Sequence, residues 1–296
     1  MIYRYLQNHR LAKKTLIGIP YFWLIVFILV PFVMILKISI SEPVCGTPPY
    51  KDLFQFMENH IVQLNINLEN YQLIFTDMIY RYSLWQSLKI AFWSTFFCLL
   101  LGYPMAYYIA CQEEHRQTRL LLLILLPFWT SFLLRIYAWI GILSPTGFLN
   151  SMLMKIGLIT EPLSLLYTSG STVVGMVYCY LPFMILPLYA SLSKFDPSLL
   201  EASADLGSKP FKTFLQVTMP LSKPGIIGGC ILVFIPSVGE FVIPELLGGN
   251  KTLMLGKVIW IEFFTNRDWP VASALAVLMI LCLVVPVVLL QKRGES

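Results

Sequence analysis

Long runs of apolar residues recur along the chain and are separated by shorter polar stretches. A helix needs about 20 predominantly apolar residues to cross the hydrocarbon core of a bilayer. By that length the pattern predicts six membrane-spanning helices, which we place at residues 16–37, 84–111, 120–143, 172–193, 225–247 and 271–290. The first run is too long, and is followed by too many further runs, to be a cleaved signal peptide. We therefore expect an all-α, polytopic membrane protein.

Composition supports this expectation. Of the 296 residues, 57% are hydrophobic and only 12% are charged, and the mean hydropathy is +0.72. A soluble domain of this size would carry about twice that share of charge. We expect a short cytoplasmic segment at residues 1–15 and one membrane domain over residues 16–296.

The basic residues predict the orientation of the spans. If the N-terminus is cytoplasmic, inner segments carry twelve basic residues and outer segments carry six. Lys and Arg are enriched in cytoplasmic loops, so both termini are expected inside. The net charge of +5 then reflects topology and attraction to the inner leaflet, and no nucleic-acid surface is expected. The inner residues are Arg4, Arg10, Lys13, Lys14, Arg116, Arg119, Lys194, Lys209, Lys212, Lys223, Lys292 and Arg293, and the outer ones are Lys51, Arg81, Lys155, Lys251, Lys257 and Arg267.

Cysteine and histidine give no sign of a metal or cofactor site. Four cysteines fall inside predicted spans, where a small hydrophobic role is expected: Cys98, Cys179, Cys230 and Cys282. Cys45 is alone in the predicted outer segments, so no intrachain disulfide is expected there. The three histidines lie on different segments.

The largest polar stretch is a predicted outer loop at residues 41–83, and it is acidic. Within it, apolar residues at 53–73 recur near helical spacing, which predicts short helices lying on the membrane surface. This loop is either a solvated connection or a docking surface for an external protein that delivers substrate. The spaced residues are Phe56, Ile61, Leu64, Leu68 and Tyr71.

A second polar stretch, residues 194–224, is predicted on the cytoplasmic side. Asp196 followed by Pro197 is a favourable helix start, because the carboxylate accepts free backbone N–H groups and proline suits the first turn. Gly207 is suited to the left-handed conformation that ends a helix. A second short amphipathic helix should follow and end at Pro220. The sequence thus predicts two helices bent at a glycine.

The spacing within this loop is specific. Glu201-Ala202-Ser203 is followed after three residues by Gly207, and after nine more by Val217-Thr218-Met219-Pro220. This order resembles the EAA signature of ABC importer permeases, with Ser203 in place of the usual second alanine. In that family the loop docks on the ATPase subunit, which implies that Glu201 and Gly207 carry coupling, while Ala202 and Ser203 permit close approach. The alternative is a loop that packs under its own helices.

The resemblance extends over most of the chain. Residues 70–75, 126–139, 181–189, 239–249 and 266–270 are similar to segments of bacterial polyamine importer permeases, and 239–249 looks more like the putrescine permease. The resemblance implies a permease subunit that carries putrescine or spermidine across the bacterial inner membrane. It also implies the partners: an ABC ATPase dimer, a second permease subunit, an extracytoplasmic polyamine-binding protein and membrane lipid.

The sequence carries no nucleotide-binding or catalytic motif. No Gly-x-x-x-x-Gly-Lys-Ser/Thr phosphate loop occurs, and the glycine-rich stretch at 248–252 has the wrong spacing. No nucleophile–base pair stands out either. The chain is therefore not expected to be an enzyme, and ATP hydrolysis is expected on a partner.

Two carboxylates lie in the fifth predicted span. Glu240 and Glu245 are accompanied by Pro236, Gly239 and Pro244, which interrupt the hydrogen-bond ladder of a helix. A carboxylate near mid-membrane costs roughly 2.5–3.5 kcal/mol, so it is usually retained for an ion pair or a transport path.

Arg135 is a candidate partner for Glu240. Each lies fifteen residues along an outward run, which places both about 22 Å above the inner edge at about 1.5 Å per residue. One hypothesis is an ion pair that only neutralises both charges. The other is that Glu240 faces a water-filled cavity and attracts a cationic substrate.

Aromatic residues on the third and fourth spans are further candidates for the pathway. Most such residues belong to interfacial belts, but Trp129, Tyr137 and Tyr178 are able to stack on a cation. Two other functions stay open. The same machinery could carry another small solute, although Glu240 and Glu245 argue against anions. A proton-coupled carrier working alone is disfavoured by the docking loop.

Overall fold

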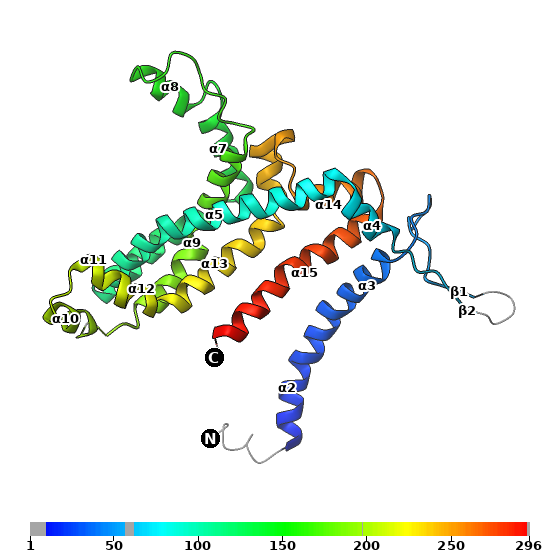
Figure 1. Cartoon of the computed structure of the whole chain (residues 1–296), viewed down its shortest axis with the longest axis horizontal. Coiled ribbons are helices and arrows are strands. Elements are labelled where there is room, and N and C mark those ends of the chain that lie inside the picture. The colour runs from blue at the N-terminus through cyan, green and yellow to red at the C-terminus, as the bar shows by residue number, and fades with distance from the viewer. Residues whose placement is uncertain (1–9, 57–61, 197, 295–296) are drawn as a thin grey trace. The chain divides into compact units, whose positions relative to one another are not determined.

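The structure is a computed structural model that describes residues 10–56, 62–196 and 198–294 (Figure 1). The chain divides into two compact units, which are Met1–Asp77 with Ile259–Pro286 and Met78–Val258 with Val287–Ser296. Most of the predicted segment 1–15 lies outside the described residues, and the first described helix begins at Arg10.

The first unit contains the N-terminal helices and a small hairpin. Its elements are α2 (Arg10–Leu24), the π-helix η1 (Ile25–Leu29), α3 (Val30–Ser39), β1 (Phe54–Phe56), β2 (Val62–Leu64), α4 (Glu69–Thr76), the π-helix η6 (Ile261–Thr265) and α15 (Trp269–Gly294), whose last residues fall outside this unit.

All the regular elements in the described part of the second unit are helices. Its elements are α5 (Met78–Ala110), α6 (Glu114–Leu125), the 3-10 helix η2 (Leu126–Trp129), α7 (Phe132–Leu143), α8 (Phe148–Lys155), α9 (Ser169–Leu192), α10 (Ser198–Asp205), α11 (Pro210–Thr213), the π-helix η3 (Phe214–Thr218), α12 (Met219–Leu221), α13 (Lys223–Val238), the π-helix η4 (Pro244–Gly248), the 3-10 helix η5 (Gly249–Lys251) and most of α14 (Leu255–Trp260).

These helices confirm the predicted all-α membrane fold. Among the described residues, Leu16–Ser39, Met78–Ala110, Phe132–Lys155 and Ser169–Leu192 are long and apolar enough to cross a bilayer. A bent pair, Pro210–Leu221 and Lys223–Val238, adds a fifth candidate. Trp269–Val284 is apolar but shorter. Length and composition therefore support four or five spans in the described chain, and with the shorter helix Trp269–Val284 they are consistent with the predicted six.

The third predicted span, 120–143, is not one continuous helix. Helix α6 ends at Leu125, a 3-10 turn follows, and the backbone is extended at Thr130 before α7 begins at Phe132. Pro127 lies in this break. Proline has no N–H to donate and disfavours helix in the residue before it, which gives the interruption its physical reason.

The outer loop also differs from its prediction. Within residues 53–73, which were expected to form short helices, the strands β1 and β2 pair antiparallel. In the described part of this stretch the helix is α4, which begins at Glu69. Alternation and helical spacing are hard to separate in a short apolar run, which is why the prediction failed. Ile61 lies outside the described residues.

Helix α4 is tied to the end of α3 by side-chain hydrogen bonds. The Asn70 side chain is buried and donates to the carbonyl oxygens of Ser39, at 3.0 Å, and Ser41, at 2.9 Å. The hydroxyls of Tyr71 and Ser39 are 2.8 Å apart. These bonds satisfy the carbonyl groups that a helix C-terminus leaves free.

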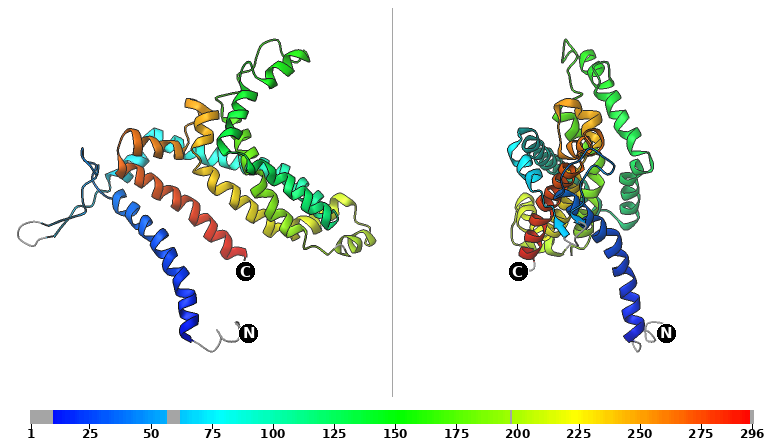
Figure 2. Two further views of the ribbon diagram at one scale, coloured as in Figure 1. Left: turned by 180° about the vertical axis from the view of Figure 1, so that it is seen from behind. Right: turned by 90° about the vertical axis from the view of Figure 1, so that its right-hand side faces the viewer.

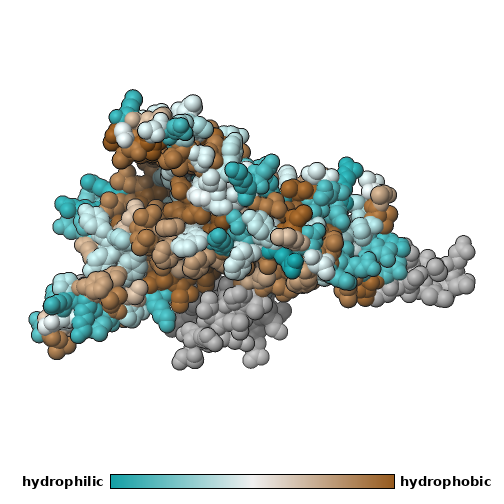
Figure 3. Space-filling model, turned by 45° about the horizontal axis from the view of Figure 1, so that its top comes forward, coloured by the Kyte–Doolittle hydropathy of each residue, from teal (hydrophilic) through white to brown (hydrophobic). Residues whose placement is uncertain are grey.

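The core of the second unit lies between α5, α9 and α13, which lie side by side in Figures 1 and 2. Its fully buried side chains include Ile90, Met176, Met184, Ile185 and Val233. In contrast, large apolar side chains elsewhere are exposed, and hydrophobic residues cover much of the surface visible in Figure 3. This distribution fits a protein surrounded by acyl chains rather than water.

A glycine sets the approach of α13 to α9. A Cβ atom at Gly225 would lie 2.6 Å from the Ser191 Cβ and 2.8 Å from the Pro187 carbonyl oxygen. One turn later, a Cβ at Gly228 would lie 3.8 Å from the Pro187 Cβ, an ordinary contact. Close approach is therefore required at Gly225 and not at Gly228.

We expect Gly225→Ala to lower the free energy of unfolding by about 1–3 kcal/mol, because the added methyl group overpacks the contact between the two helices. Gly228→Ala, the matched control, should be neutral or slightly stabilising. Thermal unfolding of the purified chain in detergent measures both. Equal stability of the two variants would contradict the close approach of these helices.

Candidate functional site

The polar segment between α9 and α13 forms a bent pair of short helices, which we name the elbow (residues 198–221). Figures 1 and 2 show it at one end of the α5, α9 and α13 group, carried by α10, α11 and α12. The second arm, Pro210–Leu221, meets α13 at an angle of 67°.

The first arm of the elbow begins as predicted. The Asp196 carboxylate accepts a hydrogen bond of 3.0 Å from the backbone N–H of Ser198, the first residue of α10. This bond lowers the pKa of the carboxyl group, because it stabilises the charged form. The cap is therefore present wherever the carboxylate is ionised and is lost in acid, as the pH falls through that lowered pKa. Pro197 lies outside the described residues.

The bend itself is a glycine C-cap, which confirms the left-handed conformation predicted for Gly207. Its φ is +76°. The Gly207 N–H donates to the Ala204 carbonyl oxygen at 2.8 Å, and the Ser208 N–H donates to the Ser203 carbonyl oxygen at 3.1 Å. This pair of bonds is the Schellman motif, which needs the left-handed residue at its centre.

A side-chain hydrogen bond joins the two arms. The Ser203 hydroxyl lies 3.0 Å from the Thr213 hydroxyl. Ser203 was the position at which the sequence departs from the usual alanine. The structure gives the added hydroxyl a partner across the bend, a contact that spacing alone did not suggest.

The second arm is anchored to α5. The Phe214 ring packs edge-on against Tyr103, with ring centroids 5.4 Å apart, and the Tyr103 hydroxyl lies 2.8 Å from the Ser222 hydroxyl. The rest of the elbow is open: Glu201, Ala202 and Pro220 are exposed, and the apolar Leu206 and Phe211 are 88% and 73% exposed. One side of the elbow thus packs on its own unit, as the alternative interpretation required. The other side presents apolar side chains that no described residue of this chain covers.

Glu240 lies in the break after α13, which ends at Val238. One carboxylate oxygen accepts from the backbone N–H groups of Phe241, at 3.1 Å, and Val242, at 3.0 Å. The other accepts a hydrogen bond from the Tyr180 hydroxyl on α9. The carboxylate therefore caps the start of the next helical segment and links it to α9.

The predicted pairing of Glu240 with Arg135 is not formed. Within the described residues there is no ion pair between the two side chains, and the Arg135 Nε and Nη1 atoms are buried without a hydrogen-bond partner. The guanidinium lies over the Phe128 ring, 4.7 Å from its centroid, and 5.7 Å from that of Phe132. Aromatic faces partly replace the missing anion.

Glu245 has a partner that the sequence analysis missed. Its carboxylate lies 2.7 Å from the ammonium of Lys257, whose side chain is 8% exposed, whereas that of Glu245 is 46% exposed. Lys257 also donates to the Gly249 carbonyl oxygen at 3.2 Å. A nearly buried cation therefore depends on Glu245, which favours a structural role for this carboxylate.

We expect Glu245→Gln to lower the free energy of unfolding by about 2 kcal/mol, because it leaves the Lys257 ammonium almost buried without a counter-charge. The double variant Glu245→Gln/Lys257→Met removes both charges and should recover most of this loss. Thermal unfolding of the purified variants measures both. A double variant less stable than Glu245→Gln would show that the pair is not the source of the loss.

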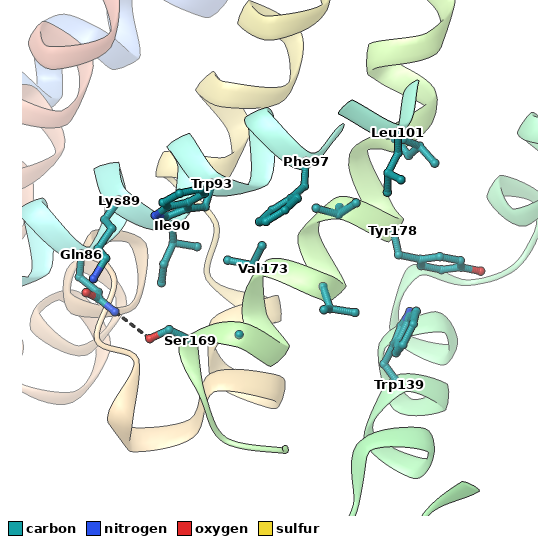
Figure 4. A pocket seen from close by; sticks show the side chains of 14 residues that line it. Gln86, Lys89, Ile90, Trp93, Phe97, Leu101, Trp139, Ser169, Val173 and Tyr178 are labelled. Atoms are coloured by element: carbon teal, nitrogen blue, oxygen red, sulfur yellow. Dashed lines mark hydrogen bonds between the residues drawn. The ribbon is translucent and has the colours of Figure 1, made fainter. Parts of the chain in front are cut away.

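One predicted aromatic residue lines a cavity. Tyr178 borders a cavity of about 700 Å³ between α5, α7 and α9, and its ring packs edge-on against Trp139, with centroids 5.6 Å apart (Figure 4). At the other end of this cavity Gln86 donates to the Ser169 hydroxyl at 2.9 Å. Lys89 also lines the cavity at this end, and the rest of the wall is apolar.

The other two predicted aromatic residues do not line this cavity within the described chain. Trp129 is 82% exposed on the 3-10 turn, and Tyr137 is exposed on α7. The structure instead brings Tyr180 to the carboxylate of Glu240. In the sequence Tyr180 resembled any aromatic residue of an interfacial belt, so only its three-dimensional neighbour reveals it.

Comparisons with known proteins agree on the class. Residues 120–293 match the family described as "Binding-protein-dependent transport system inner membrane component". The chain is 40% identical over 270 residues to the spermidine/putrescine transport system permease protein PotB of Haemophilus influenzae, covering 91% of this chain and 89% of that protein. It is 38% identical to PotB of Escherichia coli, covering 89% of each chain. It is 31% identical to the inner membrane ABC transporter permease protein YdcU of Escherichia coli, covering 77% and 76%.

Two solved structures share the fold. A bacterial ABC transporter that imports the acidic polysaccharide alginate matches with a TM-score of 0.68 at 16% identity, covering 99% of this chain and 98% of that one. The alginate transporter in complex with its pentasaccharide-bound periplasmic protein matches with a TM-score of 0.69 at 15% identity, covering 97% and 94%.

Proposed function

The chain belongs to the family of binding-protein-dependent transport system inner membrane components, and on that premise we propose that its cargo is a polyamine, putrescine or spermidine. It is a multi-pass permease subunit of the inner membrane, a transport component rather than an enzyme. The observation that carries the proposal is the 40% identity, over 91% of this chain, to a protein described as a spermidine/putrescine permease.

For the partners, we propose an ABC ATPase dimer, a second permease subunit and an extracytoplasmic polyamine-binding protein. The elbow is the contact for the ATPase, with Glu201 as a hydrogen-bonding group and Gly207 as the bend. Support comes from its exposed apolar residues Leu206 and Phe211, which are unfavourable in water unless another protein covers them.

For the topology, we propose that both termini are cytoplasmic. The elbow and the rest of loop 194–224 then face the ATPase, and the loop 41–83 faces the binding protein on the outside. Support comes from the bias of basic residues toward the inner segments.

For the pathway, we propose that Glu240 is the carboxylate that attracts the ammonium groups of the cargo. Tyr178 is the first candidate to stack on the cation, because it lines the cavity beside α9. Tyr137 and Trp129 are weaker candidates because of their exposure, and Glu245 is weaker because Lys257 already neutralises it.

The test uses the assembled importer in liposomes. We expect its ATPase rate to rise with a binding protein loaded with putrescine or spermidine, and we expect labelled polyamine to accumulate inside. Binding proteins loaded with other small solutes should not stimulate it. Stimulation by one of those solutes would replace the proposed cargo, and uptake by this chain alone under a proton gradient would replace the ATP-driven mechanism.

A further inference from the structure

Arg135 is a charged residue that the proposed function leaves unused. It lies on α7, and its Nε and Nη1 atoms are buried with no hydrogen-bond partner in the described part of the chain. The rings of Phe128 and Phe132 hold the guanidinium in place. A buried charge without an anionic partner is unfavourable, and cation–π contacts offset only part of that cost. Such a residue is expected to find an anion in another state of the protein.

Glu240 is a candidate anion in the same unit. Helix α7 contacts both α9 and η4, the segment that begins four residues after Glu240. Glu240 itself is bonded to α9, because it accepts a hydrogen bond from the Tyr180 hydroxyl. The two opposite charges therefore lie on segments that contact the same helix, and they form no ion pair with each other in the described chain.

Glu240 is held by hydrogen bonds and, among the described residues, by no ion pair. Its partners are one hydroxyl, on Tyr180, and two backbone N–H groups that follow the break after α13. A carboxylate also matches the planar fork of a guanidinium, which gives shorter and stronger bonds than a hydroxyl does. The break at Gly239 leaves no continuous helix to fix the carboxylate relative to α13.

We infer that Arg135 is the internal competitor of the cationic cargo for Glu240, and this inference rests on the proposed function. In the state described here Glu240 is held by Tyr180 and is available to an ammonium group. In a later state of the transport cycle Glu240 leaves Tyr180 and pairs with Arg135, and the cargo is released. Arg135 is thus a positioning residue that sets how long the carboxylate retains a cation.

The experiment is a double-mutant cycle in the assembled importer. The variants are Arg135→Gln, Glu240→Gln and the double variant, and Arg135→Lys is the matched control that keeps the charge but loses the fork. Three quantities are measured: the rate of labelled putrescine uptake, the putrescine still bound to the complex after ATP is added, and the thermal midpoint of the resting complex.

We expect Arg135→Gln to slow uptake by about tenfold and to raise the bound putrescine, because Glu240 no longer has a competitor. Arg135→Lys should fall between this variant and the wild type. In the double variant, uptake should be no slower than in Glu240→Gln alone, and the bound putrescine should be low. The resting midpoint should not fall in Arg135→Gln, since the pair is absent from that state.

Two results would overturn the inference. One is an additive cycle, in which the double variant loses the product of the two single losses. The other is a fall in the resting midpoint of Arg135→Gln with no rise in bound putrescine, which indicates a merely structural residue. A wild-type complex that takes up no polyamine instead contradicts the proposed function, so the two failures are distinguishable.

Discussion

Gly207→Val is expected to lower transport by at least about tenfold while the chain still inserts into the membrane. The φ of +76° at this residue is unfavourable for any L side chain by about 1–2 kcal/mol, and more so for a β-branched one. A penalty of this size lowers the ratio of the bent to the unbent elbow by a factor of about 5–30. Apart from its two chain neighbours, no described residue has a heavy atom within 4 Å of a Cβ placed there, so the substitution strains the backbone without a steric clash.

Asparagine is the matched control for this position, since it tolerates the left-handed conformation better than other non-glycine residues. Gly207→Asn should retain most of the uptake. The measurements are ATP-dependent uptake in liposomes and the amount of assembled complex recovered with the ATPase. Uptake by Gly207→Val at the wild-type rate would contradict a role of the bend in coupling.

Glu240→Gln is the second variant with a large expected effect, a loss of polyamine uptake of about tenfold or more. Glutamine has nearly the same shape, and its amide oxygen can still accept from the N–H groups of Phe241 and Val242. The substitution therefore removes the charge but keeps the cap. Since an ammonium group interacts far more strongly with a carboxylate than with an amide, the loss should fall on substrate passage.

Two comparisons separate charge from structure at this site. Tyr180→Phe removes the hydroxyl that binds Glu240 but keeps the carboxylate, so it should slow uptake less than Glu240→Gln does. Glu240→Ala removes the cap as well and should also lower the thermal midpoint. If Glu240→Gln transports polyamine normally, the carboxylate is a helix cap and not part of the pathway.

The long apolar helices were predictable from the sequence because the bilayer imposes them. A long apolar run without charge has few alternatives to a helix in lipid, so the class and most helices follow from the sequence. The short outer hairpin was not predictable. A few apolar residues such as Phe56 and Leu64 fit both the two-residue period of a strand and the 3.6-residue period of a helix. The break near Pro127 was overlooked because the hydrophobic run continues through it.

The elbow was predictable for a different reason. Helix starts and glycine caps depend on neighbouring residues in the chain, so Asp196 and Gly207 revealed their conformations in advance. Contacts between distant residues carry no such local signal. The Tyr180–Glu240 contact joins α9 to the break after α13, and the Lys257–Glu245 contact spans a break in the helical chain. Depth along an ideal helix suggested Arg135 as one possible partner of Glu240, and this pair is absent from the structure described here.

The hydroxyl contact between Tyr103 and Ser222 has a mechanical consequence. Ser222 is the single residue between the second arm of the elbow and α13, and Tyr103 belongs to the 33-residue helix α5. A force on the elbow therefore reaches both α5 and α13 through the contact between Tyr103 and Ser222. If α5 tilted without α13, this contact would break and the Phe214 ring would separate from the Tyr103 ring. The two helices are therefore expected to move together when the elbow moves.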